Sequence, residues 1–357
     1  MKYEIRRRKD GKRAIFDENG NMISPYWFDW IEPDGLVKGE SPYYIARKDW
    51  KYAIFDKDGN QISDWFDEIY LSGLIKKESD YYIAKKGKKV AIFDKNGNMI
   101  TKEWFDSLWI EGLVKGQSPY YIAVKDGKKA IFDIDGNRIS DWYDSISIDG
   151  LIRGESDYYI AEKDRKMAIF HKDGRQISQW FDEVYSDGLV KGQSHLYIVN
   201  IDSKYAIFDK NGRMISPECF NWIEPDGLVW GKSDYYIAKK SWGYAIFPIW
   251  KYAIFDINGN QITKEWYDRI FLNGLVKGEC DYYLVCNENT CAVYHKNGQK
   301  VSNDFSVEDI YAVKNITFNE NLGIAELFDG KGNLIKSVDF IYPFKEEIID
   351  YTKLLNI

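Results

Sequence analysis

Three kinds of residue pattern in this chain could support chemistry. The first is the acidic run Asp-x-Asp-Gly-Asn, as at Asp56 to Asn60 and Asp133 to Asn137, which brings oxygen ligands close together as calcium sites do. A calcium loop of the EF-hand type needs glycine at its sixth position and glutamate at its twelfth. Here glycine comes fourth and Asp67 comes twelfth. We therefore interpret these runs as turns.

The second pattern is an aromatic-acidic element, Trp-Phe-Asp or Trp-Tyr-Asp. An aromatic face beside a carboxylate could stack on a sugar ring and accept hydrogen bonds from its hydroxyls. The same residues could instead pack in a core while the aspartate accepts hydrogen bonds from backbone amides. Because the element recurs along the chain, a structural role is favoured, with sugar contact as the alternative. The element begins at Trp27, Trp65, Trp104, Trp142, Trp180 and Trp266.

The third pattern is a group of cysteines. Cys286 and Cys291 would face each other across a hairpin, and Cys280 stands where comparable segments have serine. A zinc site needs four ligands, and His295 is the only nearby histidine. We expect no metal here, only small, half-buried cysteines that stay reduced in the cytoplasm.

Acid-base catalysis usually needs a base and an orienting partner in one cleft. The three histidines lie in different segments and at unrelated positions, and the periodic carboxylates offer no unique pair. We therefore expect no enzyme activity and no cofactor. The histidines are His171, His195 and His295.

These residues belong to an internal repeat. The tripeptide Ala-Ile-Phe recurs every 38 or 39 residues, except once, and returns in altered form as Ala292-Val293-Tyr294. Such a period is typical of repeat architectures, and it predicts eight units. The alanines of the tripeptide are Ala14, Ala53, Ala91, Ala130, Ala168, Ala206 and Ala253.

Each unit is expected to consist of short strands. An apolar run at 81–84 leads through a charged link to a second run at 90–93, and an Asn-Gly or Asp-Gly pair follows five residues after each motif alanine. Such pairs between apolar runs are a strong hairpin signal. The 27 Tyr, 19 Phe and 13 Trp suit strands, and no segment of the repeats keeps a helical apolar period. The fold class is therefore predicted to be all-β.

One unit cannot bury its apolar residues alone, so neighbouring units must stack. An open β-solenoid is favoured over an eight-bladed β-propeller, because the first unit begins at Tyr3 in the same phase as the others and leaves no strand to complete a ring. We divide the chain into the array, residues 1–300, and a degenerate capping repeat, residues 301–357. A short helix is expected over 344–355, where apolar residues recur at helical spacing.

The exception in spacing is a duplication. Eight residues ending at Ile249 precede a similar segment that begins at Trp250, so the repeat around 242–257 is longer than the others. Pro248 lacks the amide hydrogen that a ladder needs. We expect the extra residues to form an extended hairpin or loop and not a new unit.

The repeats resemble the bacterial WG-repeat (KWG) family. The likeness rests on segments such as Tyr52-Ala53-Ile54-Phe55-Asp56 with the following Asp58-Gly59, then Trp65-Phe66-Asp67 and Gly73-Leu74, and it covers about residues 3–300. This chain mostly has Tyr, Lys, Val or Met before Ala where the family has Trp-Gly. The resemblance implies a β-rich array that mediates interactions and has no shared catalytic site.

Charge and composition narrow the partner. The net charge is −7, with 49 basic and 56 acidic residues interspersed, so no basic block is present to bind nucleic acid. No signal peptide and no stretch of about 18 uncharged apolar residues is apparent, so we expect a cytoplasmic protein without membrane insertion.

The residues that break the repeat are the best candidates for recognition, because the common residues are needed for the fold. We expect a binding module or scaffold for another protein, with carbohydrate or cell-wall binding as the alternative. The candidate binding residues are Trp30, Trp109, Trp222, Trp230, Trp242 and Trp250.

Overall fold

The computed structural model describes residues 2–242 and 248–341. It divides into two compact units: unit 1 comprises residues 1–186 and 190–192, and unit 2 comprises 187–189 and 193–357. The described residues form strands and no helix. The predicted helix at 344–355 lies outside the described residues, and the predicted division at residue 300 remains a prediction.

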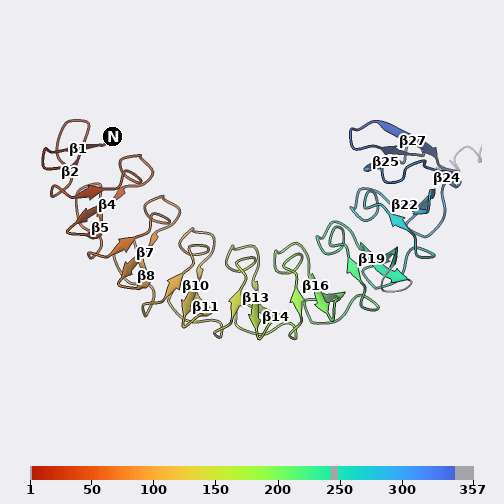
Figure 1. Cartoon of the computed structure of the whole chain (residues 1–357), viewed down its shortest axis with the longest axis horizontal. Coiled ribbons are helices and arrows are strands. Elements are labelled where there is room, and N and C mark those ends of the chain that lie inside the picture. The colour runs from red at the N-terminus through yellow and green to blue at the C-terminus, as the bar shows by residue number, and fades with distance from the viewer. Residues whose placement is uncertain (1, 243–247, 342–357) are drawn as a thin grey trace, which may run out of the picture. The chain divides into compact units, whose positions relative to one another are not determined.

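Unit 1 contains fifteen short strands (Figure 1). They are β1 (Glu4–Arg7), β2 (Arg13–Phe16), β3 (Trp30–Ile31), β4 (Tyr43–Lys48), β5 (Lys51–Asp56), β6 (Glu68–Ile69), β7 (Tyr81–Lys86), β8 (Lys89–Asp94), β9 (Ser107–Leu108), β10 (Tyr120–Lys125), β11 (Lys128–Asp133), β12 (Ser145–Ile146), β13 (Tyr158–Lys163), β14 (Lys166–His171) and β15 (Glu183–Val184).

The described residues of unit 2 form the remaining twelve strands. They are β16 (Leu196–Ile201), β17 (Lys204–Asp209), β18 (Trp222–Ile223), β19 (Tyr235–Trp242), β20 (Ile249–Asp256), β21 (Arg269–Ile270), β22 (Tyr282–Asn287), β23 (Thr290–His295), β24 (Phe305–Ser306), β25 (Asn315–Asn319), β26 (Ile324–Phe328) and β27 (Leu334–Asp339).

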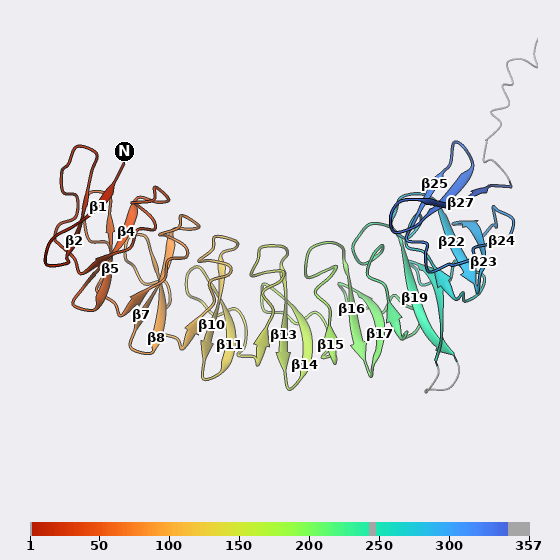
Figure 2. The ribbon, with the colours of Figure 1, turned by 45° about the horizontal axis from the view of Figure 1, so that its top comes forward.

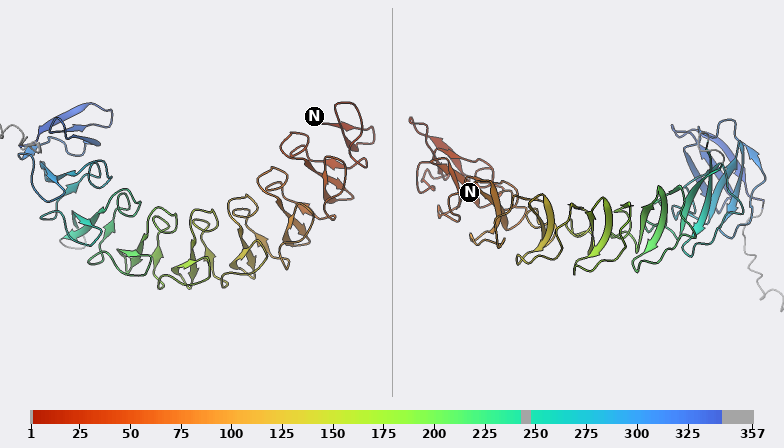
Figure 3. Two further views of the ribbon diagram at one scale, coloured as in Figure 1. Left: turned by 180° about the vertical axis from the view of Figure 1, so that it is seen from behind. Right: turned by 60° about the horizontal axis from the view of Figure 1, so that its bottom comes forward.

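From β3 to β23, each small antiparallel sheet joins the two-residue strand that ends one repeat to the hairpin of the next repeat. In unit 1, β1 pairs with β2, and the sheets β3-β4-β5, β6-β7-β8, β9-β10-β11 and β12-β13-β14 follow along the chain. In unit 2, β16 pairs with β17, and the sheets β18-β19-β20, β21-β22-β23-β24 and β25-β26-β27 follow. Within each unit, successive sheets lie side by side (Figure 3). The predicted all-β tandem array is confirmed, and no sheet of the described residues closes into a barrel.

The acidic runs are turns, as the spacing of their glycines predicts. One carboxylate oxygen of Asp56 accepts hydrogen bonds from the backbone N–H groups of Asp58 (2.9 Å) and Asn60 (2.8 Å). The other oxygen accepts one from the Asn60 side chain at 2.9 Å. The aspartate therefore closes a loop on its own backbone.

The hydrophobic core lies between neighbouring repeats. In one cluster, Ile54 of one repeat packs with the fully buried Tyr82 and with Phe93 of the next, and Trp104 of that same next repeat packs against them. The Tyr82 and Phe93 rings are stacked, with centroids 5.5 Å apart. Stacking on a neighbour thus buries aromatic surface that one small sheet leaves in water.

Glycines mark the points where the repeats approach most closely. Gly112 has a φ of +80°, and a Cβ there would overlap the carbonyl oxygen of Tyr120. It would also lie 3.2 Å from the carbonyl oxygen of Ile152 in the next repeat. Both the turn and the close approach therefore require glycine at this position.

The duplicated segment lengthens one hairpin, as its sequence predicts. Strands β19 and β20 have eight residues each, against six in β10 and β11. Two further pairs, Ser241 with Trp250 and Trp242 with Ile249, continue the ladder beyond the pair Lys240–Lys251. The long hairpin that begins with β19 is visible in Figure 2.

A segment of unit 2 folds back over its sheet β21-β22-β23-β24. Val307, Ile310 and Val313 belong to the same core cluster as Cys286 and Cys291 of this sheet. One face of that sheet is therefore covered by the chain itself.

Candidate binding surface

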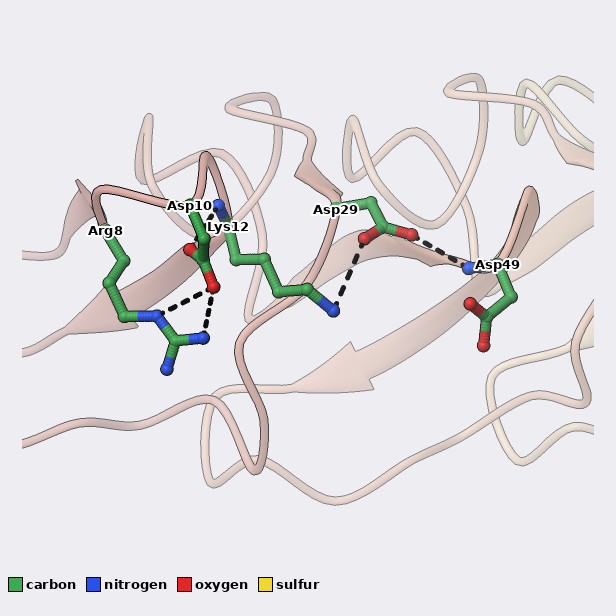
Figure 4. A network of polar contacts seen from close by, with 5 residues as sticks. All are labelled: Arg8, Asp10, Lys12, Asp29 and Asp49. Carbon is green, nitrogen blue, oxygen red and sulfur yellow. Dashed lines mark hydrogen bonds and ion pairs between the residues drawn. The ribbon is translucent and has the colours of Figure 1, made fainter.

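The aromatic-acidic element is part of the frame. Asp29 accepts a hydrogen bond from the backbone N–H of Asp49, at the hairpin turn of the next sheet, over 2.9 Å, and Lys12 lies 3.7 Å from its other oxygen (Figure 4). Asp106 binds the N–H of Asp126 (2.8 Å) and Lys89 in the same way. These carboxylates already have partners, so they are poorly suited to bind a sugar.

The tryptophan of the element also packs inside the array. The Trp65 ring lies 6.0 Å from the Phe55 ring and 6.4 Å from the Phe28 ring. Both phenylalanines are fully buried. These contacts support a structural role for the aromatic-acidic element, which the sequence also favours.

The expectation of reduced cysteines is wrong for Cys286 and Cys291. The two residues are directly paired across β22 and β23, with Cα atoms 4.1 Å apart, and form a disulfide. The pairing places both sulfur atoms on the same side of the sheet, beneath the segment that covers it. Cys280 is a free, partly buried thiol, and burial raises its pKa to about 11.

The variable residues gather on one face of each sheet. In sheet β3-β4-β5, Trp30 pairs with Arg47, which pairs with Tyr52, so one residue of each strand forms a cross-strand row. Directly opposed residues share a face of the sheet. The corresponding rows are Glu68–Lys85–Val90, Ser107–Val124–Lys129, Ser145–Glu162–Met167, Trp222–Lys239–Tyr252 and Arg269–Cys286–Cys291.

The six tryptophans singled out from the sequence lie at different places. Trp222, Trp242 and Trp250 are exposed in unit 2, whereas Trp30 and Trp109 of unit 1 and Trp230 of unit 2 are half-buried. Trp109 packs against a core cluster of unit 1. The indole N–H of Trp230 is buried without a hydrogen-bond partner. The structure thus gathers three of the six around the long hairpin.

Two of these three share a face with a lysine. The Lys239 ammonium lies 4.0 Å from the Trp250 ring and 5.7 Å from the Tyr252 ring, and Trp222 is its cross-strand neighbour. Trp242 lies on the opposite face, where its ring is 5.1 Å from that of Trp266. The duplication therefore adds one tryptophan to each face of the hairpin.

A cleft of about 780 Å³ opens beside this row, within unit 2. One wall consists of Ile249, Trp250 and Tyr252 of β20, and the opposite wall includes Ile310 and Tyr311 of the covering segment. The exposed fraction is 75% for Tyr311 and 56% for Ile249. Exposed apolar side chains that line a concave surface are typical of interaction sites.

Charged side chains form the floor of the cleft. The guanidinium of Arg269 donates to the carbonyl oxygens of Ile310 (2.9 Å) and Val313 (3.4 Å) and lies 5.4 Å from the Tyr311 ring. Burial lowers the pKa of Arg269. Burial alone would raise the pKa of Asp268, but hydrogen bonds from Lys251 and from the backbone N–H of Glu288 leave it below its usual value.

Several surface residues were missed by sequence reasoning. Among the large apolar residues that the structure describes, Trp50 has the largest exposed fraction, 82%, and Tyr311 lies outside the regular repeats. Trp50 could have been found by comparing hairpin links, because Lys48-Asp49-Trp50-Lys51 corresponds to Lys125-Asp126-Gly127-Lys128. Arg47, which lies beside Trp50, also differs from the residues at the same position in the other rows.

Among the described residues, no group of three or more histidine, cysteine, aspartate or glutamate side chains is arranged to hold a metal ion. The described part of the chain also has no helix that could span a membrane.

Comparison with known proteins gives only distant structural similarity. No family model and no curated protein sequence matches the chain. A eukaryotic initiation factor structure aligns with a TM-score of 0.31 and 11% identity over 92% of this chain and 89% of that one. Kluyveromyces lactis Hsv2 aligns with a TM-score of 0.27 and 10% identity over 84% and 96%. Citrobacter koseri AztD aligns with a TM-score of 0.26 and 7% identity over 92% and 91%.

Proposed function

We infer that the chain is a non-enzymatic interaction module of the WG-like repeat type, which binds another protein at the cleft beside the long hairpin of unit 2. The observation that carries this proposal is the grouping of Ile249, Trp250 and Tyr311, all exposed, around one concave surface. None of the three is required by the repeat. Large exposed aromatic anchors are the residues that contribute most to protein interfaces.

The alternative of carbohydrate or cell-wall binding through the aromatic-acidic element has less support. Its carboxylates accept hydrogen bonds from hairpin turns and pair with lysines, and its tryptophans pack on buried phenylalanines. A sugar would have to compete with these contacts. The cleft at Trp250 is free of this conflict.

The test is affinity capture from a lysate of the source organism with a shortened hairpin as comparison. Replacing residues 241–250 by Asp-Gly gives the link Lys-Asp-Gly-Lys found at 125–128, because Lys240 and Lys251 are already paired as Lys125 and Lys128 are. We expect a stoichiometric protein partner of the native chain to be lost from this variant and from Trp250→Ser.

The matched control is Arg165→Gly, which makes the same Asp-Gly link in the hairpin β13–β14 and should retain the partner. Equal capture by the native chain and by the shortened variant would contradict the proposed site. Recovery of glycans alone would contradict protein binding.

A further inference from the structure

Unit 1 carries a second cluster of aromatic and basic side chains on its cross-strand row. The Arg47 guanidinium lies 5.1 Å from the Trp50 ring and 6.0 Å from the Tyr52 ring. Trp30 is the cross-strand neighbour of Arg47, and the Arg13 guanidinium lies 3.7 Å from its ring. We call these five residues, Arg13, Trp30, Arg47, Trp50 and Tyr52, the unit 1 patch.

The positive charge of this patch is not neutralised locally. The nearby carboxylates of Asp29 and Asp67 pair with Lys12 and Lys51. Among the ion pairs of the described residues, none includes Arg13 or Arg47, and both guanidinium groups lie over aromatic rings. Arginine stacked on a ring keeps N–H donors at its edge that can bind a carboxylate.

Trp50 is held in a conformation that its own side chain disfavours. Its φ is 63°, in the left-handed region, where a bulky residue is strained. The equivalent residue in hairpin β10–β11 is Gly127, with a φ of 76°. Because 82% of the Trp50 side chain is exposed, packing inside the protein does not compensate for this strain. Arg165 (φ 62°) and Ser203 (φ 64°) have the same backbone conformation at the equivalent position of other hairpins, so the turn imposes it, and what distinguishes Trp50 is its large exposed ring.

Unit 2 shows what kind of molecule this face of a sheet can hold. The row Arg269–Cys286–Cys291 is covered by the segment Val307-Glu308-Asp309-Ile310-Tyr311-Ala312-Val313. Arg269, which occupies the first position of its row, donates to two carbonyl oxygens of that segment. The segment combines two carboxylates with apolar side chains. It is an internal example of a peptide docked on a cross-strand row.

We propose that the unit 1 patch binds a segment of a partner protein that contains acidic and apolar residues, docked on its row as residues 307–313 dock on theirs. Arg47 and Arg13 bind carboxylates or backbone carbonyls of the segment, and Trp30 and Trp50 contact its apolar side chains. This site is separate from the cleft of unit 2, so it can fail while the proposed function holds.

The experiment measures binding of a fluorescent peptide with the sequence of residues 306–314 to the full chain by anisotropy. A second peptide carries Gln and Asn in place of Glu308 and Asp309. We expect the native peptide to bind, and the neutral peptide to bind about tenfold more weakly or less, because carboxylate–guanidinium pairs contribute strongly when they are partly desolvated. Equal binding of the two peptides would contradict the acidic specificity.

Three variants locate the peptide on unit 1. Trp50→Gly restores the Lys-Asp-Gly-Lys link and should reduce binding about tenfold or more while leaving the melting temperature unchanged or higher, since it removes a strained residue. Arg47→Gln should remove the preference for the acidic peptide, and Arg47→Lys should keep it. Binding that is unaffected by Trp50→Gly and Arg47→Gln would overturn the proposal.

Nucleic acid is the competing ligand for aromatic rings beside arginines. A fluorescent single-stranded oligonucleotide is therefore titrated in the same assay. Weak binding of the oligonucleotide that Trp50→Gly leaves unchanged agrees with a peptide site. Tight binding that Trp50→Gly abolishes, with no binding of the acidic peptide, would overturn it.

Discussion

Two sheets of unit 1, β3-β4-β5 and β9-β10-β11, share one interior and differ on their outer row. In the first, Tyr44 stacks on Phe55 with centroids 5.5 Å apart; in the second, Tyr121 stacks on Phe132 at the same distance. Their rows are Trp30–Arg47–Tyr52 and Ser107–Val124–Lys129. The ring pair inside the sheet is thus the same in both, whereas the row differs from one sheet to the other.

This difference separates two kinds of constraint on the sequence. A residue that touches the next repeat must fit both its own sheet and its neighbour. Some row residues share that constraint, because Val90 is buried with Tyr121 of the next repeat, whereas Arg47 and Lys85 are only partly covered. Substitutions should therefore have large effects on stability at interior positions, and large effects on binding with little change in stability at partly exposed row positions such as Arg47.

The sharpest way to break the shared interior is to add one carbon where two repeats meet. We expect Gly112→Ala to destabilise the protein by about 3 kcal/mol or more, because a left-handed φ and overlap with backbone atoms act together. Gly127→Ala is the control, since its φ is +76° and its Cβ would meet nothing within 4 Å. That change should cost about 1 kcal/mol. Chemical denaturation measures both.

Similar midpoints for the two glycine variants would show that close approach at Gly112 does not hold the repeats together. The free energy of unfolding would then depend on the hairpins alone. Interior and row positions would tolerate substitution equally well.

The repeat could be predicted from the sequence because the signals for strands, turns and inter-repeat contacts all recur with the same period. Ala-Ile-Phe, the Asp-x-Asp-Gly-Asn turn and the aromatic-acidic element specify strand, turn and inter-repeat contact at a fixed spacing. The extended hairpin followed from the duplication of eight residues around Pro248. These features are local, or repeat often enough that one copy explains the others.

The binding surfaces were only partly predictable, because they depend on which residues oppose each other across strands. Trp250 was recognised as a departure from the repeat, but its neighbour Lys239 became visible only through the register of β19 and β20. Trp50 was missed because it becomes apparent only when the short hairpin links are compared with one another, as Lys-Asp-Trp-Lys against Lys-Asp-Gly-Lys. The disulfide between Cys286 and Cys291 was missed because residue spacing does not reveal that a folded-back segment buries the pair.

Two buried hydroxyl groups, one with hydrogen-bond partners and one without, give a finer test of the interior. The Ser140 hydroxyl accepts a hydrogen bond from the Ile131 N–H at 2.8 Å and donates to the Asp141 carbonyl at 2.9 Å. The Tyr121 hydroxyl is buried without a partner, as are those of Tyr44, Tyr159, Tyr197 and Tyr236. Both substitutions, Ser140→Ala and Tyr121→Phe, remove one oxygen atom.

We expect Ser140→Ala to destabilise the protein by about 1–3 kcal/mol, because it leaves a buried N–H without an acceptor. Tyr121→Phe should be neutral or stabilise by up to about 1 kcal/mol, because it removes an unpaired buried hydroxyl. Denaturation midpoints of the two variants, measured side by side, decide the matter. A large loss for Tyr121→Phe would mean that the hydroxyl has a partner, such as a bound water that bridges the repeats.

The smallest expected effect concerns the carboxylates that join neighbouring hairpins. Asp106 has a pKa below its usual 3.8, first because of its hydrogen bond with Lys89 and then because of the Asp126 N–H. A folded-state pKa below the unfolded value means that this contribution is complete above about pH 4 and is lost as the pH falls through the folded value. Since the pair is exposed, the change in melting temperature should be slight.

Asn221 supplies the natural control for this pair, because its amide oxygen accepts a hydrogen bond from the Ser241 N–H at 3.0 Å as the aspartates do from theirs. Asp106→Asn should keep the turn contact and lose only the pH-dependent part, so that its melting temperature approaches that of the native chain at about pH 2. Asp106→Ala should lose the turn contact as well and remain lower at every pH. A constant gap between Asp106→Asn and the native chain from neutral to acidic pH would show that the carboxylate charge does not help to hold the hairpins.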